Sequence, residues 1–265
     1  MDKKFLKWYR LFTGVIHGDK LKNHDWAVWQ AALASQQRET IDISELAMEG
    51  RKMKKVIDVD GNKYKTVKIG HQVWMAENLK VTHYRNDDAI PNVLDKYEWE
   101  ESSIGAYCNY GNDEKYVSVY GRLYNWDAVH DSRGLAPAGW HIPTDEEWKQ
   151  LEVYLGGISR QQADGFIHHG TDEGGRLKEI GAEHWRSPNI GATNKSRFSG
   201  IPGGYRATNG AFSDFGYLAT FWSISSARNN NLAWIRLLSY NNSGVAWRRI
   251  CNYMHGGFSV RCVRD

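Results

Sequence analysis

Apolar and polar residues follow a two-residue period in residues 67–79, which read Val67-Lys68-Ile69-Gly70-His71-Gln72-Val73-Trp74-Met75-Ala76-Glu77-Asn78-Leu79. Upstream, Val56-Ile57-Asp58-Val59 and residues 64–70 flank Asp60-Gly61-Asn62, which is a turn signal. We therefore expect a β-hairpin from 56 to 70 with its turn at 60–62. Residues 72–79 continue as a strand that ends in a polar turn.

The clearest helix signal begins at Pro143. Thr144, with Glu147 three residues later, forms a capping box. The residues expected to face the core follow at helical spacing: Trp148, Leu151, Glu152 and Leu155. Gly156-Gly157 ends the helix. Two helices and many short strands between glycine-rich loops indicate an α+β domain with mostly antiparallel pairing.

Two segments carry weaker signals. Residues 82–118 contain Pro91 and many Asn, Asp and Tyr residues, and we expect them to be surface loop. In residues 1–55, Asn23 or Asp25 could cap a helix whose apolar residues share helical spacing: Trp26, Trp29, Ala32 and Leu33. Residues 1–55 either pack as helices on the same domain or form an N-terminal helical segment for attachment or oligomerisation, and residues 56–265 form the main domain.

Composition and charge exclude several classes. The net charge is +3 and the cations are scattered, which argues against nucleic-acid binding. No stretch approaches the 18 apolar residues of a membrane span. Lys7 and Arg10 interrupt the N-terminal apolar residues and no small-residue cleavage site follows, so we expect synthesis in the cytoplasm without a signal peptide. Cys108, Cys251 and Cys262 cannot all pair and have no zinc-ligand spacing.

Five blocks of sequence follow one another along the chain: residues 67–79, Gly121-Arg122-Leu123-Tyr124-Asn125-Trp126, Ala136-Pro137-Ala138-Gly139-Trp140-His141-Ile142-Pro143-Thr144, Phe198-Ser199-Gly200-Ile201-Pro202-Gly203-Gly204-Tyr205-Arg206 and Gly257-Phe258-Ser259-Val260-Arg261-Cys262-Val263. In this order they resemble the Fibrobacter succinogenes major paralogous domain. That family is similar to the C-type lectin-like fold, in the branch that also holds formylglycine-generating enzymes and the variable proteins of diversity-generating retroelements. The resemblance implies an α+β domain over 56–265, with short, mostly antiparallel strands, two or so helices and long loops.

The C-terminal part resembles a retroelement variable protein. In such proteins a reverse transcriptase corrupts adenines in a copied template, so Asn, Tyr and Ser codons are rewritten while the flanking frame persists. Here residues 216–223 and 257–265 make a regular frame around Asn-rich, irregular contents, including an unpaired Cys251. The frame residues expected to hold the fold are Phe221, Trp222, Phe258, Val260 and Cys262.

The expected recognition surface therefore lies in a candidate variable region, residues 224–255. The candidate ligand-binding residues are Arg228, Asn229, Asn231, Trp234, Ile235, Leu237, Ser239, Tyr240, Trp247, Arg249, Cys251, Tyr253 and His255. Aromatic and Arg side chains give contact area and directional polar contacts at interfaces. Residues 234–240 alternate as a strand with two faces: either one face binds and the other belongs to the core, or both faces are buried.

Catalytic and metal signals are poor. Formylglycine-generating enzymes rely on a reactive cysteine pair close together in sequence, whereas Cys251 and Cys262 are eleven residues apart. His168-His169, with Asp164 or Asp172, have the chemistry of metal ligands, but adjacent His in a Gly-flanked loop is typically exposed. Ile90-Pro91-Asn92 and Asn125-Trp126-Asp127 only partly match the calcium motifs of true C-type lectins. We expect no enzyme activity, metal or other cofactor.

These features predict a non-enzymatic protein that displays a diversified recognition surface on a C-type lectin-like scaffold, in a bacterium or phage. Its partner is then an unknown protein or cell-surface ligand. In a phage it is a virion-associated receptor-binding tip, attached to the tail or another assembly through residues 1–55. The sequence is also compatible with a homo-oligomer. The alternatives are an undiversified family member with a structural or cell-surface role and a divergent formylglycine-type oxidase.

Overall fold

The computed structural model describes residues 55–156, 172–227, 232–251 and 255–265. The chain divides into two compact units, Met1–Met53 and Lys54–Asp265, and all described residues lie in the second. The predicted helix at 23–35 therefore lies outside the described residues. Over the described ranges, no helix is long and apolar enough to cross a membrane.

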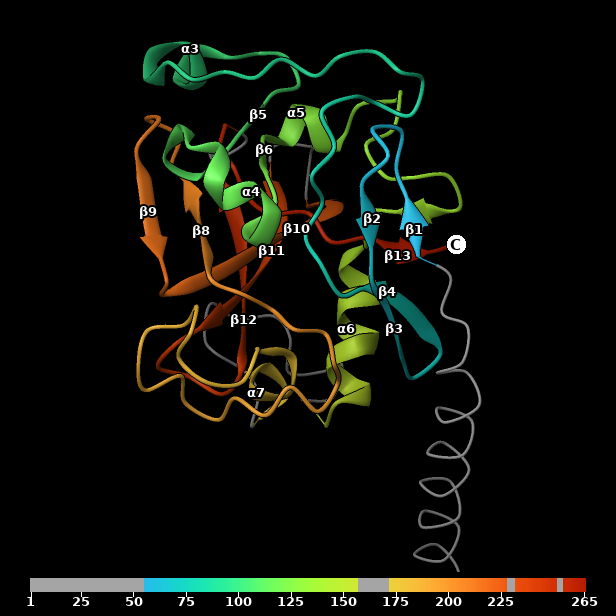
Figure 1. Ribbon diagram of the computed structural model, residues 1–265, viewed down its shortest axis with the longest axis vertical. Helices are drawn as coiled ribbons and strands as arrows, with labels where there is room; N and C mark the ends of the chain where they lie inside the picture. Colours follow the sequence, from blue (N-terminus) through green and yellow to red (C-terminus); the bar gives the residue numbers. More distant parts are fainter. Residues whose placement is uncertain (1–54, 157–171, 228–231, 252–254) are drawn as a thin grey trace, which may run out of the picture. The chain divides into compact units, whose positions relative to one another are not determined.

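The second unit is an α+β domain built on two larger sheets (Figure 1). The five-stranded sheet has the order β12-β11-β10-β8-β9, with β8 Gly203–Arg206, β9 Phe212–Phe215, β10 Leu218–Ala227, β11 Leu232–Ser239 and β12 Val245–Cys251. The four-stranded sheet has the order β3-β4-β13-β7, with β3 Thr66–Ile69, β4 Gln72–Met75, β7 Trp140–His141 and β13 Val263–Arg264. Only β8 and β10 pair in parallel; the other named strand pairs are antiparallel.

The predicted hairpin is confirmed at its turn but its second arm is divided. β1 Val56–Ile57 pairs with β2 Lys63–Tyr64 across the expected turn. The chain then leaves this ribbon at Lys65, whose carbonyl accepts a 2.8 Å hydrogen bond from the Ala76 N–H, and β3 pairs with β4 instead. The strand predicted to reach Leu79 ends at Met75, because the Leu79 N–H donates to Val260 rather than to a strand neighbour.

The capped helix is confirmed. α6 Asp145–Tyr154 begins with both halves of the Thr144–Glu147 capping box. The whole predicted stripe, Glu152 included, is buried. Gly156 follows with a φ of 84°, a backbone conformation that glycine adopts without the steric cost of a Cβ atom.

The prediction of a surface loop at 82–118 is wrong. This segment holds α3 Lys96–Glu101, β5 Tyr107–Cys108, two 3₁₀ turns, η1 Tyr110–Asn112 and η2 Glu114–Tyr116, and α4 Val117–Tyr120; its strand β5 pairs with β6 Leu123–Tyr124. Asp95 caps α3 by accepting two backbone N–H bonds, and Trp99 on that helix is 1% exposed. A six-residue helix with one apolar anchor has too few turns to show helical periodicity, so the sequence pattern missed it.

Two hydrophobic cores lie on the two faces of the five-stranded sheet. One contains Trp222, Phe258, Val260 and Cys262, and the other contains Phe221 with tryptophans from β4 and α6. All five frame residues predicted to hold the fold are at most 4% exposed, which confirms their structural role. Two more short helices, α5 Trp126–Val129 and α7 Glu173–Leu177, lie near opposite ends of this sheet (Figure 1).

Buried cations tie the long loops to these cores. The Arg206 guanidinium donates to four backbone carbonyls, including that of Val93 at 2.6 Å, and lies over the Trp99 ring. The fully buried Arg261 donates to Asn78 and Phe198 and lies 4.2 Å from the Phe198 ring centroid. A buried charge is tolerated only where its donors are satisfied, so these contacts fix loop backbones that no strand holds.

Candidate functional site

The register of the five-stranded sheet divides the candidate variable region between two ends of the sheet. Ala227 pairs with Leu232, and Leu232 pairs with Cys251 on the next strand. The end of β10, the start of β11 and the end of β12 therefore lie at the same end of the sheet. We call this the open end of the sheet: the last residues of β10 and β12, the first residues of β11 and the turn at His255.

At the opposite end the same region is held tightly. The Lys178 ammonium donates 2.8 Å hydrogen bonds to the carbonyls of Ile190, Ser239 and Asn242. Glu173 of α7 accepts from the Val245 N–H at 2.8 Å. The β11–β12 turn, residues 240–244, is thus clamped from α7 and the following loop, and we call this the anchored end.

Backbone contacts reinforce the anchored end. The Gly175 N–H donates to Ser243 at 2.7 Å, and a Cβ atom on Gly175 would overlap the Gly191 carbonyl oxygen. A Cβ atom on Gly174 would likewise overlap the Gly244 carbonyl. Two glycines of α7 therefore permit a close approach that an alanine would forbid, and this approach sets the position of the turn.

The central strand is buried on both faces, which is the second of the two expected arrangements. Ile235, Leu237 and Ser239 are 2%, 9% and 7% exposed, and Ile235 and Leu237 belong to the first core. Leu238 on the other face lies in the second core. The assignment of Ile235, Leu237 and Ser239 as ligand-binding residues is therefore corrected: packed cores cover both faces of the sheet, and these side chains are buried.

Two further candidates lie at the edges of the second core. Trp234 and Tyr240 are half-buried and pack against that core. Tyr240 lies at the anchored end, where its ring is 5.1 Å from that of Tyr217 and its carbonyl accepts from the Ile190 N–H. Trp234 lies near the open end and pairs in register with Arg249. The structure thus separates two residues that the sequence placed on one candidate surface.

The remaining candidates lie in β12 or outside the described residues. Trp247, Arg249 and Cys251 lie in β12, opposite Arg236, Trp234 and Leu232. The side chains of these three β12 residues are outside the described structure, as are Arg228, Asn229, Asn231 and Tyr253 altogether.

His255 begins the return of the chain into the frame. It is half-buried, and its Nδ1 atom is buried without a hydrogen-bond partner among the described residues. Burial raises the pKa of Asp127 on α5, while the nearby His255 and His130 act in the opposite direction. The described rim of the open end is therefore polar, with Asp127 near His130 and His255.

A bulge shapes the last part of β10. The pairing register between β10 and β11 shifts between Trp222 and Ser226. Within this break the Ile224 N–H donates to the Pro143 carbonyl at 2.9 Å, and the Ser225 hydroxyl accepts from the Asp145 N–H at 2.9 Å. The start of α6 thus replaces β11 as the partner of this segment and supports the open end from one side.

Sequence reasoning missed the buried ion pairs beneath the region. Arg236, 1% exposed, donates to Glu152 at 2.7 Å and to the Asp145 carboxylate at 2.7 Å. Burial raises the pKa of Glu152 to about 7, and Arg236 opposes that shift. A signal was present, because an Arg inside an apolar strand and a Glu on the core-facing stripe of α6 both require buried partners.

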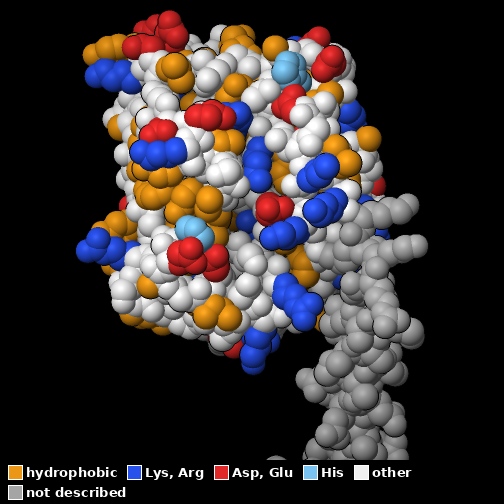
Figure 2. Space-filling view, in the orientation of Figure 1, with side chains coloured by type: hydrophobic (Ala, Val, Ile, Leu, Met, Phe, Trp, Pro, Cys, Tyr) orange, Lys and Arg blue, Asp and Glu red, His pale blue; other side chains and the backbone are white. Residues whose placement is uncertain are grey.

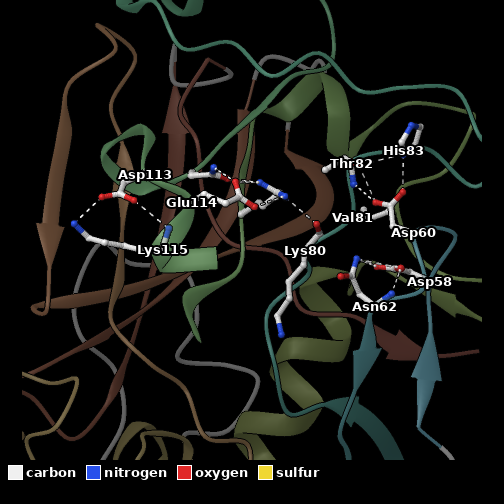
Figure 3. Close-up of polar contacts among 12 residues, drawn as sticks. Asp58, Asp60, Asn62, Lys80, Val81, Thr82, His83, Asp113, Glu114 and Lys115 are labelled. Carbon is white, nitrogen blue, oxygen red and sulfur yellow. Dashed lines mark hydrogen bonds and ion pairs between the residues drawn. The ribbon is translucent and has the colours of Figure 1, made fainter. Parts of the chain in front are cut away.

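The acidic β1–β2 turn is a candidate cation site only by composition. Figure 3 shows Asp58 and Asp60 with their carboxylates directed at protein donors. Asp58 accepts from Asn62 and from the Tyr64 hydroxyl at 2.5 Å, while Asp60 accepts from Thr82 and lies 2.5 Å from His83 Nδ1. These contacts fasten the turn to the following loop. Over the described ranges, no group of three His, Cys, Asp or Glu side chains is placed to hold a metal ion.

The metal-ligand candidates at 164, 168 and 169 lie outside the described residues. Asp172 is described, and its carboxylate pairs with Arg176 at 2.9 Å. Cys108 and Cys262 are free and buried, and burial raises the pKa of both thiols, to about 12 for Cys108. A buried, protonated thiol is a poor nucleophile.

A family model matches most of the chain. The model of the Fibrobacter succinogenes major domain matches residues 67–264. The chain belongs to that family. None of the curated proteins and none of the solved structures compared with the chain matches it. In this member of the Fibrobacter succinogenes major domain family, the matched range takes in both larger sheets almost completely, from β3 to β13, and includes the whole candidate variable region.

Proposed function

We propose that this member of the Fibrobacter succinogenes major domain family is a non-enzymatic binding protein whose recognition surface is the open end of its five-stranded sheet. The observation that carries the proposal is the register of Ala227, Leu232 and Cys251, which places the last residue of β10, the first of β11 and the last of β12 at the same end of the sheet. Candidate contact residues there are Arg228, Asn229, Asn231, Trp234, Arg249, Cys251, Tyr253 and His255.

The contrast between the two ends supports this choice. At the anchored end a buried ammonium, a buried carboxylate and two glycines hold the β11–β12 turn. Beyond the open end the frame rejoins the sheet at Gly257, whose N–H donates to the Arg206 carbonyl and whose carbonyl accepts from the Arg206 N–H. A surface that varies in sequence needs a scaffold whose stability does not depend on it, and the burial of the frame residues supplies one.

We further propose that the domain has the C-type lectin-like fold and that the open end is diversified, as in the variable proteins of retroelements. The fold proposal rests on the five sequence blocks together with the observed short, mostly antiparallel strands and long loops. The diversification proposal rests on the Asn-rich contents of a regular frame. In a phage, the expected partner is a cell-surface receptor and residues 1–55 are the attachment segment.

A binding role is favoured over the formylglycine-type oxidase. Cysteine catalysis needs a thiolate that a substrate can reach. Cys262 is fully buried, and burial raises the pKa of its thiol well above the usual range. A cysteine at that position fills core volume instead of attacking a substrate.

The neighbouring DNA tests diversification directly. We expect a reverse transcriptase gene and a near-copy of the 3′ end of this gene that differs from it only at adenines. If both are absent from the natural locus, the diversification proposal is overturned and an undiversified family member with a structural or cell-surface role remains.

Display libraries test the location of the surface. In one library residues 228–231 and 252–254 are randomised, and in the matched control library residues 241–244 are randomised. We expect the first library to stay folded and to yield binders to a purified probe protein such as lysozyme. The second library should lose folded members for two reasons. It removes the Asn242 side chain, which accepts from the Gly244 N–H at 2.7 Å, and the Asn241 side chain, which accepts from the Ser239 hydroxyl at 2.6 Å. It also places larger side chains in a turn that packs closely on α7. Equal yields from the two libraries would contradict the assignment.

A further inference from the structure

A cluster of half-exposed aromatic rings lies on a part of the domain that the proposed function does not use. Tyr110, Tyr116 and Tyr120 surround Phe215, with ring centroids 4.6, 4.9 and 4.6 Å from that of Phe215. We call these four residues the aromatic platform. They come from η1, η2, α4 and β9, so four separate elements contribute one ring each.

The platform is exposed as one surface. All four side chains are half-buried. Figure 2 shows a continuous hydrophobic patch over the region of α4 and β9, with a histidine and acidic side chains along one edge. Aromatic residues that only fill a core are covered on all sides, whereas these rings pack on one another and keep a face to solvent. Contiguous exposed apolar patches mark interaction sites more often than chance.

The rim of the platform is acidic. Burial raises the pKa of Tyr120, and the carboxylates of Glu179 and Glu183 lie close enough to raise it further. Asp214 acts on Tyr110 in the same way. His184, whose ring centroid lies 5.6 Å from that of Tyr120, is 2.7 Å from Glu179. The chain as a whole carries a net charge of +3, so this concentration of carboxylates is local.

One ring of the platform already receives a cation. The Lys115 ammonium lies 4.8 Å from the Tyr116 ring centroid and 2.6 Å from the Asp113 carboxylate. Figure 3 shows Lys115 directed at Asp113. An ammonium held between a tyrosine ring and a carboxylate is the arrangement that a lysine or arginine of a partner would make with the other rings and the remaining acids.

We propose that the aromatic platform and its acidic rim bind a basic peptide segment of a partner protein. The rings offer flat faces for cation–π contacts and the stems of Lys and Arg, and Glu179, Glu183 and Asp214 offer the opposite charge. This site is independent of the recognition surface, because β9 and β12 are the two opposite edge strands of the sheet.

The test uses the full-length chain and two fluorescent peptides of equal length, one alternating Lys with Ala and one alternating Glu with Ala. Fluorescence anisotropy should show saturable binding of the Lys peptide, weakened by added salt, and no binding of the Glu peptide. The double change Tyr116→Ala with Tyr120→Ala should weaken binding at least about tenfold. The matched control is Tyr97→Ala on α3, an exposed tyrosine with the Lys96 ammonium 4.4 Å from its ring centroid, and should leave affinity unchanged.

A second variant keeps the test valid if the double change unfolds the chain. Glu183→Lys alters only an exposed rim residue, so its melting temperature should match that of the original chain while Lys-peptide affinity falls. Equal affinity for both peptides, or a saccharide ligand that binds the platform without salt dependence, would overturn the proposal in favour of a neutral ligand. Self-association that Tyr116→Ala with Tyr120→Ala abolishes, without peptide binding, would overturn it in favour of a second copy of this chain.

Discussion

Single buried cations hold loops of this domain in place by donating hydrogen bonds to backbone carbonyls, and Lys178 is the clearest case. Its ammonium donates to three carbonyls on two loops and one strand end, and burial lowers the pKa of its amine to about 8. Lys178→Met keeps the apolar stem but leaves three carbonyls without this donor. We expect a loss of about 3 kcal/mol in the free energy of unfolding, measured by urea denaturation.

The matched control for this change is Lys195→Met, which removes an exposed lysine in the loop that follows α7. It should change the free energy of unfolding by less than about 0.5 kcal/mol. If both variants unfold at the same urea concentration as the original chain, the clamp at the anchored end contributes nothing to stability.

His141 gives the domain a pH-dependent contact. Burial acts to lower the pKa of His141, but hydrogen bonds to Asp265 at 2.7 Å and Glu147 at 2.8 Å raise it above 6.5 overall. A raised folded-state pKa contributes stability that is fully present below the unfolded pKa and is lost as pH rises through the folded pKa. We expect the stability advantage of the original chain over His141→Gln to be largest below about pH 6 and to shrink towards about pH 9. Thermal unfolding of both chains across this pH range measures the difference in their stability, and a difference that does not change with pH would contradict the prediction.

At the scale of elements, α7 packs closely against the following loop because Gly175 has no side chain. Gly175→Ala would drive a Cβ atom into the Gly191 carbonyl, which is backbone and cannot swing aside. We expect a loss of about 2–3 kcal/mol in the free energy of unfolding. Gly203→Ala in β8 is the matched control, since the nearest atom to its Cβ is 3.6 Å away, an ordinary contact. Equal losses in the free energy of unfolding for the two variants, measured by urea denaturation, would contradict this explanation.

Elements with a complete local signal were predictable. α6 carries a capping box and three turns of spaced apolar residues, so its start, stripe and end follow from sequence. α3 carries only a cap and Trp99, and what fixes it is Arg206, more than a hundred residues away, donating to carbonyls at its start. The division of the second hairpin arm at Lys65 has a local cause: Lys65 and Ala76 flank the β3–β4 hairpin and pair with each other, a choice of partner that alternation alone does not indicate.

At the scale of the whole molecule, the two compact units predict separable behaviour. A fragment of residues 54–265 contains both cores and every sheet, so we expect its melting temperature to lie within about 3 °C of that of the full chain. If residues 1–55 are an oligomerisation segment, sedimentation will show an oligomer for the full chain and a monomer for the fragment. A fragment that fails to fold would show that the units depend on each other.

The candidate site was predictable only in outline. The frame and its irregular contents are visible in the sequence, and so is the strand at 234–240. Whether a face of that strand is exposed depends on what covers it, and both faces are covered: one by the second core, which includes α6, and the other by the first core, whose rings come mostly from other strands and from α5. Alternation cannot distinguish a half-buried strand from one between two cores when Ile235, Leu237 and Leu238 follow each other closely.

The position of β13 has a consequence for synthesis. This strand lies between β4 and β7, so the four-stranded sheet lacks a central member until Val263 has left the ribosome. A nascent chain that stops or changes reading frame anywhere in residues 224–255 never closes that sheet. Such products would leave Trp74 and its neighbours exposed, and we expect cellular proteases to remove them. Only chains translated in frame through the proposed recognition region would then reach the folded state.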